Sequence, residues 1–433
     1  MIIHDYELKN KNIIKQENAN DFMGIKIKEG EPYIYVPQTF RISENLTERN
    51  KTLLIFLRSI SLATKQNEKI NQSQNKGDQW PLDSYLWIIY DFIDNGFYYN
   101  REKIFFNGVN GKIDWKRTLK KTPVYSNGNI IYTEMVSSKV LPTNDDISEI
   151  YKYCLILSSK RIGWLLNFHL KLPFIQRLSI NEMKYIVRKE LSSTFDDMKR
   201  LRFNHMLNIL SNTDDSTLNS CYHVYGIENY YYVYERMIDK YFKGISQNEI
   251  LKYYPHGQWH LLPNLNRSFP SSELRPDTIH HRIDGQGNKY TYIIDAKLYK
   301  YGGLEYIDHP SFGLPETTSI QKQITYGEYI QHYIDKDSNV RNTFVLPFNK
   351  ELERFKNESS SIEYLDKNRN LAFIGYCTGN WKTQYENDKN LNHYYKYIFT
   401  FLIDFNHLLL NYKKDNKDIL DLFDKVEKLL QNM

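Results

Sequence analysis

The stretch from 274 to 300, LRPDTIHHRIDGQGNKYTYIIDAKLYK, constrains the fold of this chain more than any other part of its sequence. Two runs with strand character flank the segment 284–287, Asp-Gly-Gln-Gly, whose glycines accept the positive φ angles that tight hairpin turns need. The run after the turn, 289–294, is rich in β-branched and aromatic residues, which is typical of a buried strand. The sequence therefore predicts a β-hairpin whose second strand is buried.

The open end of this hairpin carries three charged side chains. Asp277 lies near the start of the first strand, and Asp295 and Lys297 lie at the end of the second. Residues two apart on a strand share a face, so Asp295 and Lys297 project together and meet Asp277 if that face lies opposite it. Both carboxylates are hard ligands suited to Mg²⁺, and the carbonyl of Ala296 can add another oxygen. A metal-activated water with Lys297 beside it is the chemistry that cuts a phosphodiester.

The alternative is that this motif has no function, because Pro-Asp followed by an acidic-x-Lys triplet arises by chance in a long, lysine-rich chain. Two observations favour function over chance. Both acids lie at strand positions around a legible hairpin, and a strongly apolar strand that ends in Asp-Ala-Lys has no evident packing rationale. A helix predicted over about 226–243 adds Glu235, which can complete a metal shell; the alternative is an exposed glutamate on an amphipathic helix. We expect Asp277, Asp295, Lys297 and Glu235 to form one site.

Two further segments are candidates for contacts with a phosphate backbone. One is the run WKRTLKK at 115–121, where cations accompany a tryptophan, and the other opens a helix predicted over 317–334. Solvated surface is the alternative in both cases. The side chains that we expect to contact nucleic acid are Lys116, Arg117, Lys120, Lys121, Gln321, Lys322, Gln323 and Tyr326.

Length and composition limit the remaining possibilities. A chain of 433 residues exceeds the usual size of a single core, so we expect two domains, 1–215 and 216–433, divided at the polar cluster 211–220. The net charge of +5 permits a polyanionic partner, and three scattered cysteines support no disulfide framework. The apolar run near 397–412 is too polar to span a bilayer, and the first residues lack a signal-peptide pattern, so we expect a cytoplasmic protein without a membrane partner.

Secondary-structure patterns outside the hairpin are legible as well. The polar run 65–79 is expected to be a mobile loop, and the segment 418–430 is expected to be an amphipathic helix. The histidines at 256, 260, 280 and 281 make a zinc site conceivable, but their spacing matches no compact zinc finger. Further helices are predicted at 52–64, 81–97, 145–157, 180–191 and 194–210, and further strands at 344–347, 371–376 and 397–404.

The chain resembles the PD-(D/E)XK nuclease superfamily, with Pro276-Asp277 and Asp295-Ala296-Lys297 in the motif positions and Glu235 on the preceding helix. More narrowly, it resembles LlaJI-type restriction endonucleases. The matching pieces are GKIDWKRTLKK at 111–121, LRPD at 274–277, IIDAKLY at 293–299 and LPETTSIQKQITY at 314–326.

That resemblance implies a fold of the α/β (α+β) class. Its restriction-endonuclease-like core would be a mixed central sheet flanked by helices, preceded by an N-terminal mixed α/β recognition domain. It also implies Mg²⁺-dependent double-strand cleavage of DNA at or near a specific sequence, within a restriction–modification system. Some related systems use a separate AAA+ GTPase subunit, which agrees with the lack of a Walker-type loop in this sequence. A homodimer is the other assembly that the sequence leaves open.

Two other functions are compatible with the sequence. A structure-directed or DNA-repair nuclease would use the same core to cut flaps, junctions or ends without a short recognition sequence. A non-catalytic interaction protein with a vestigial nuclease fold is the second, and the intact Asp277, Asp295 and Lys297 argue against it.

Overall fold

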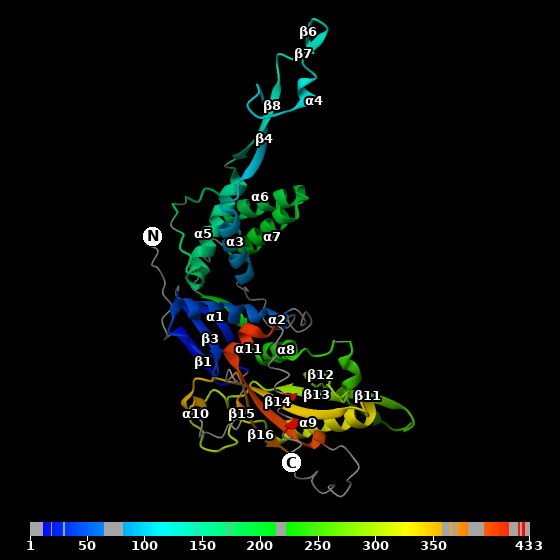
Figure 1. Ribbon diagram of the computed structural model, residues 1–433. Coiled ribbons are helices and arrows are strands. Elements are labelled where there is room, and N and C mark those ends of the chain that lie inside the picture. Colours follow the sequence, from blue (N-terminus) through cyan, green and yellow to red (C-terminus); the bar gives the residue numbers. More distant parts are fainter. Residues whose placement is uncertain are drawn as a thin grey trace. The chain divides into compact units, whose positions relative to one another are not determined.

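A computed structural model divides this chain into two compact units, formed by residues 1–8 with 77–223 and by residues 9–76 with 224–433 (Figure 1). We refer to them as the helical unit and the sheet unit. The structure describes residues 12–18, 20–28, 31–64, 81–143, 145–170, 172–173, 175–213, 222–246, 248–356, 364–365, 370–379, 394–414, 423–424 and 427–428. The predicted loop at 65–79 and most of the predicted helix at 418–430 therefore lie outside the described residues.

The predicted division of the chain is wrong for its first part, because residues 9–76 belong with the C-terminal half. Long-range contacts hold them there. The hydroxyls of Ser59 and Tyr230 lie 2.7 Å apart, and the backbone N–H of Arg41 donates to the Asn406 side chain at 2.9 Å. The predicted boundary at 211–220 falls close to the division after His223. Whether the helical unit recognises DNA stays a prediction.

Helices predicted from the sequence build the body of the helical unit. Side chains cap the starts of three of them, as in α5, where Asp145 accepts from the backbone N–H of Ser148, and in α6, where Ser179 and Glu182 form a capping box. In the core, the Arg202 guanidinium contacts Asp91 at 2.7 Å, and Tyr151 donates to the same carboxylate at 2.9 Å. The helices are α3 (Leu82–Asn95), α5 (Asp146–Leu166), α6 (Ile180–Ser193) and α7 (Asp197–Ser211).

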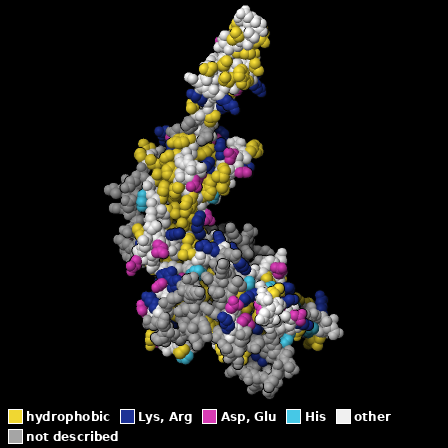
Figure 2. Space-filling view, in the orientation of Figure 1, with side chains coloured by type: hydrophobic (Ala, Val, Ile, Leu, Met, Phe, Trp, Pro, Cys, Tyr) yellow, Lys and Arg dark blue, Asp and Glu magenta, His cyan; other side chains and the backbone are white. Residues whose placement is uncertain are grey.

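A narrow β-arm extends from these helices within the same unit (Figure 1). Its shaft is the antiparallel pair β4 (Asn100–Asn107) and β8 (Val136–Thr143), with β5 (Lys112–Ile113) added to β8. Beyond the shaft lie the single turn α4 (Trp115–Thr118) and the two-stranded hairpin of β6 (Val124–Ser126) and β7 (Asn129–Ile131). Figure 2 shows hydrophobic side chains on the surface of this arm. The exposed hydrophobic residues of the arm include Trp115, Tyr125 and Ile130.

The sheet unit is built around a six-stranded mixed sheet. Its hydrogen-bonded order is β12–β13–β14–β17–β16–β15, in which β13, β14 and β17 run parallel and the other neighbours run antiparallel. The chain is therefore of the mixed α+β class. The strands are β12 (Thr278–Ile283), β13 (Lys289–Ala296), β14 (Asn339–Phe348), β15 (Tyr364–Leu365), β16 (Leu371–Cys377) and β17 (Ile398–Asp404).

Helices contact both faces of the hairpin end of this sheet (Figure 1). On one face, Thr278 donates to Asp239 of α8 (Tyr231–Tyr241) at 3.3 Å. On the other, Ile279 and Ile293 pack with Tyr326 of α9 (Thr317–Tyr329), which continues as a π-helical turn to Ile334. Side chains alternate between faces along a strand, so neighbouring residues of β12 reach opposite helices.

A second sheet and several short elements complete the sheet unit. The second sheet has the order β1–β3–β2–β9 and joins the N-terminal strands to a strand that follows the predicted boundary. Among the described residues, no helix is both long enough and apolar enough to cross a membrane. The elements are β1 (Ile13–Gln16), β2 (Met23–Lys28), β3 (Glu31–Pro37), β9 (Tyr222–Ile227), β10 (His256–His260), β11 (Ser268–Glu273), α1 (Leu46–Ser59), α2 (Ser61–Thr64), α10 (Glu353–Lys356) and α11 (Phe405–Asn411).

Candidate functional site

The predicted hairpin is present and brings its two aspartates together. Strand β12 pairs with β13 in a register that sets Thr278 opposite Ile294, so one step outward Asp277 faces Asp295. The turn is closed by Asp284, whose carboxylate accepts from the backbone N–H groups of Gln286 and Asn288, both at 2.8 Å. Gly287 has a φ of 87°, which confirms the positive φ expected for this turn.

Direct contacts hold the charged side chains at the strand end. The Lys297 ammonium lies 2.6 Å from the Asp295 carboxylate, and the backbone N–H of Ala296 donates to the Asp277 carboxylate at 2.8 Å. The backbone N–H of Lys297 donates to the carbonyl of Val345 at 2.9 Å, so the end of β13 is fastened to β14. Because these hydrogen bonds involve the backbone of two neighbouring strands, the sheet itself fixes the positions of the charged side chains.

The carboxyl group of Glu235 in α8 interacts electrostatically with the charged side chains at this strand end. The pKa of Glu235 is raised to about 7, chiefly by burial and in part by the Asp295 carboxylate, while Lys297 opposes the shift. Burial also raises the pKa of Asp277 well above its usual range, and the Asp295 and Glu235 carboxylates add to that effect. For Lys297, burial lowers the pKa, but Asp295 and Asp277 outweigh it and leave the pKa raised. The predicted set of Asp277, Asp295, Lys297 and Glu235 therefore lies within one electrostatic neighbourhood.

The donor set fits a hard divalent cation better than zinc. Within the described part of the chain, no trio of His, Cys, Asp or Glu side chains forms a ready cage for a metal ion. Mg²⁺ does not need such a cage, because it keeps several waters and binds through one or two carboxylates. Asp277 and Asp295 are two such carboxylates at one strand end, a bound cation would relieve their mutual repulsion, and their binding of Mg²⁺ stays a prediction. The role of the Ala296 carbonyl as a ligand stays a prediction.

Helix α9 packs against β13 beneath the candidate site through Gln323 and Tyr326. This packing corrects the prediction that these two side chains contact nucleic acid. Gln323 is 0% exposed, and its side-chain amide donates to the carbonyl of Ile293 in β13 at 3.0 Å. Its predicted contact with DNA is therefore wrong, because the side chain faces the sheet. Tyr326 is also buried and donates to the carbonyl of Arg275 at 3.2 Å, so its predicted contact with DNA is wrong as well. Its pKa is raised by burial and by the Asp295 and Asp277 carboxylates, so Tyr326 lies beside the acids.

The other candidate contacts with nucleic acid keep their exposure. Gln321 and Lys322 are exposed on α9, and their contact with a phosphate backbone stays a prediction. In the β-arm, Lys116, Arg117 and Lys120 are exposed around α4, while Lys121 is half-buried and lies 3.3 Å from Glu134. The Arg117 guanidinium lies over the ring of Phe105, with 3.5 Å to the ring centroid. The arm thus presents cations beside aromatic surface, and DNA contact there also stays a prediction.

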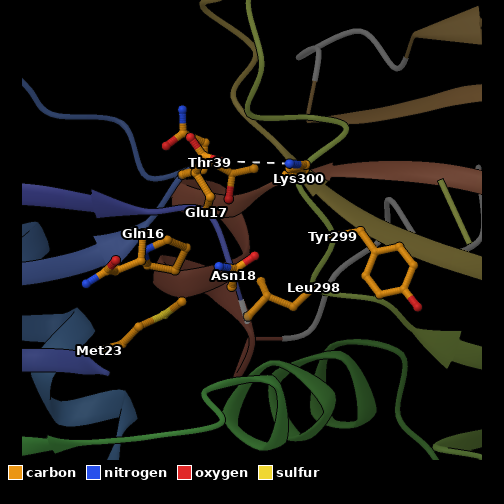
Figure 3. Close-up of a pocket in the computed structure, with 10 residues that line it drawn as sticks. Gln16, Glu17, Asn18, Met23, Thr39, Leu298, Tyr299 and Lys300 are labelled. Atoms are coloured by element: carbon orange, nitrogen blue, oxygen red, sulfur yellow. Dashed lines mark ion pairs between the residues drawn. The ribbon is translucent and has the colours of Figure 1, made fainter. Parts of the chain in front are cut away.

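A small pocket adjoins the residues that follow Lys297. It lies between the N-terminal strands and the segment Leu298–Lys300 (Figure 3). Lys300 closes one side through an ion pair with Glu17 at 3.6 Å, drawn as the dashed line in Figure 3. Its cavity volume is about 10 Å³, room for about one water molecule, so this pocket is too small to be a typical ligand site. It shows that residues from the N-terminal segment border the exit of β13.

Comparison with known proteins adds a family to this geometry. A family model described as the LlaJI restriction endonuclease matches residues 41–374. No curated protein matches the chain. A solved half-complex of tetradecameric Thermococcus gammatolerans McrB AAA+ hexamers with bound McrC contains a chain that is 12% identical, with a TM-score of 0.34. That alignment covers 94% of the present chain and 82% of the solved one, and at this TM-score it carries no conclusion about activity or assembly.

Proposed function

The chain belongs to the LlaJI restriction endonuclease family, and from that premise we propose that it is a Mg²⁺-dependent DNA endonuclease of a restriction–modification system. It cuts both strands at or near a specific sequence, in the manner of a type II enzyme with a PD-(D/E)XK site. The observation that carries this proposal is the meeting of Asp277, Asp295 and Lys297 at one strand end, with 2.6 Å between the lysine and its neighbouring aspartate.

Each residue of the site has a role that follows from its chemistry. Asp277 and Asp295 hold the cation, which when bound lowers the pKa of a water and screens charge on the phosphate. Lys297 stays protonated between the acids and donates a hydrogen bond to the attacking water or to a phosphate oxygen. The water oxygen forms a bond to phosphorus, one bridging P–O bond breaks, and the departing oxygen takes up a proton.

Glu235 adds a group that can exchange a proton near neutral pH. Its raised pKa of about 7 means that the carboxyl is partly protonated under physiological conditions before a cation enters. Entry of a cation favours its ionised form, because positive charge nearby stabilises a carboxylate. Glu235 therefore serves as an additional ligand or as the base that orients the water.

Digestion of a supercoiled plasmid tests the proposal. Purified chain with Mg²⁺ is expected to produce discrete, reproducible fragments, and EDTA is expected to stop the reaction. Asp295→Ala and Lys297→Ala are expected to abolish cleavage while leaving folding intact, with Lys300→Ala as a charge-matched control outside the acid cluster. Full activity of either site variant would remove these residues from the mechanism.

The same digestion separates this function from a structure-directed or repair nuclease. Such an enzyme would give a smear or would cut only substrates with flaps, junctions or ends. The family match favours the restriction function, because it extends over residues 41–374 and thus far beyond the hairpin.

Partners follow from the proposed activity. Double-stranded DNA is the substrate, and a second copy of the chain would supply the site for the opposite strand. A separate AAA+ GTPase subunit is the remaining proposed partner, since the sequence holds no Walker-type loop of its own. Adding GTP and candidate subunits to the plasmid assay tests that need, and cleavage by the chain alone at full rate would exclude it.

A further inference from the structure

The β10–β11 hairpin stands out because, among the residues that the structure describes, no element of its own unit covers it. Every residue of β10 is exposed, and in β11 only Ser271 is partly covered. Two-stranded ribbons without a covering layer are marginal in water, so an isolated ribbon is unusual without a partner. The two ends of the ribbon are already joined at its base, where the N–H of Leu274 donates to the carbonyl of Pro255 at 2.8 Å. The strands beyond that bond are therefore not required to link the segments on either side.

The base of this hairpin is fixed to the candidate nuclease site. Leu274 packs in the cluster that contains Ile279, Ile293 and Tyr326, and the carbonyl of Arg275 accepts from the Tyr326 hydroxyl. Strand β11 ends at Glu273, four residues before Asp277. At roughly 3.3–3.6 Å per residue, the end of the ribbon lies within about 14 Å of the aspartate. A DNA helical turn spans about 34–36 Å, so a duplex cut at Asp277 passes within reach of the ribbon.

The surface chemistry of the ribbon is that of a groove contact. The pairing of Trp259 with Phe269 places both rings on one face, and the Arg267 guanidinium lies 5.0 Å from the centroid of the Phe269 ring. The opposite face carries Gln258, which pairs with Pro270. The DNA major groove is about 12 Å wide and admits a two-stranded ribbon, and arginine is a residue type that reads guanine edges there.

We propose that the β10–β11 hairpin lies in the major groove beside the scissile phosphate and helps to select the sequence that is cut, with Arg267 contacting base edges and Gln258, on the opposite face, contacting the phosphate backbone that borders the groove. This inference rests on the proposed nuclease function and locates part of its specificity in the sheet unit. The exposed loop between the strands, where Leu262 is 81% exposed, lies at the far end of the ribbon and follows the groove. His260 braces that loop through a 2.8 Å contact with the carbonyl of Leu265.

The test compares two double variants of the full-length chain. Arg267→Ala with Gln258→Ala removes the proposed base contact and the proposed backbone contact, and both side chains are exposed, so thermal unfolding should not change. The matched control is Lys289→Ala with Gln286→Ala, which removes one cation and one amide from the exposed turn of the catalytic hairpin. The readouts are the rate and the sequenced positions of plasmid cleavage in Mg²⁺, and plasmid-fragment binding in EDTA.

Cleavage at the wild-type positions is expected to fall about 5- to 150-fold in the ribbon variant, or to spread to related sequences, while the control keeps both rate and positions. Unchanged positions and rate in the ribbon variant would overturn the inference and leave the nuclease proposal standing, as expected if the ribbon instead docks a protein. A wild-type chain that neither binds nor cuts the plasmid would remove both.

Discussion

Replacing Asp277 by asparagine tests whether the acid cluster is built for a cation rather than for stability. Asparagine keeps an oxygen that accepts from the Ala296 N–H, but it removes the negative charge that faces Asp295 and Glu235. Two unit charges about 4 Å apart at an effective dielectric near 20 repel by about 4 kcal/mol. Attraction of each carboxylate to Lys297 offsets part of this, so the metal-free variant should be stabilised by about 1–3 kcal/mol.

Thermal unfolding in EDTA and in Mg²⁺ measures this effect. At roughly 2–4 °C per kcal/mol for domains of this size, the variant should melt about 2–12 °C higher than wild type in EDTA. Mg²⁺ should raise the melting temperature of the wild type, because a ligand at 100 times its Kd adds about 2.7 kcal/mol, and should raise that of the variant far less. Adding Mg²⁺ should therefore shrink the difference between the two melting temperatures or reverse its sign.

Asp308→Asn provides the control, since Asp308 is exposed in the same unit and its loss should leave both melting curves unchanged. Two results would refute the reasoning. A lower melting temperature of Asp277→Asn in EDTA would mean that the carboxylate stabilises the fold. An equal gain from Mg²⁺ in both proteins would mean that Asp277 does not bind the ion.

Three further predictions concern other parts of the molecule. Replacing the four cations of the β-arm by alanine should weaken DNA binding. It should also flatten the slope of log K against log salt concentration by up to about 0.9 for each lost phosphate contact. An unchanged slope would mean that these side chains are ordinary solvated surface. Gln323→Ala should destabilise the sheet unit by about 1–3 kcal/mol, because the Ile293 carbonyl loses its donor, while DNA affinity in the folded protein stays the same. Arg202→Ala should destabilise the helical unit by about 3–5 kcal/mol at pH 7, because it leaves the buried Asp91 carboxylate without its partner. Burial raises the pKa of Asp91, but Arg202, Tyr151 and Asn95 outweigh burial and lower it, so wild-type stability should fall as the pH drops below about 4 and the difference from the variant should shrink. The arm cations are Lys116, Arg117, Lys120 and Lys121.

Local patterns were sufficient for the catalytic hairpin. The alternation of side chains, the Asp-Gly-Gln-Gly turn and the apolar run before Asp295 each act over a few residues, and together they set the register that brings Asp277 opposite Asp295. The helices of the helical unit were legible for the same reason, since caps such as Ser179 with Glu182 are local signals. Glu235 was identified by its position on the preceding helix, and the fold brings it to the site.

Non-local packing decided the rest. Exposed and buried faces of α9 could not be told apart from its sequence, because Gln323 is polar and yet fully buried against the carbonyl of Ile293. Residues 9–76 belong to the same unit as the C-terminal half because of contacts such as that between Ser59 and Tyr230, two residues that are far apart in the chain. The exposure of the β10–β11 ribbon is likewise a tertiary property, because a covered and an uncovered hairpin have the same turn and strand signals. By itself the sequence determined which charged groups meet at the end of the β12–β13 hairpin, since strand register depends on short-range order. The tertiary structure decided which surfaces remain exposed, since burial depends on the whole chain.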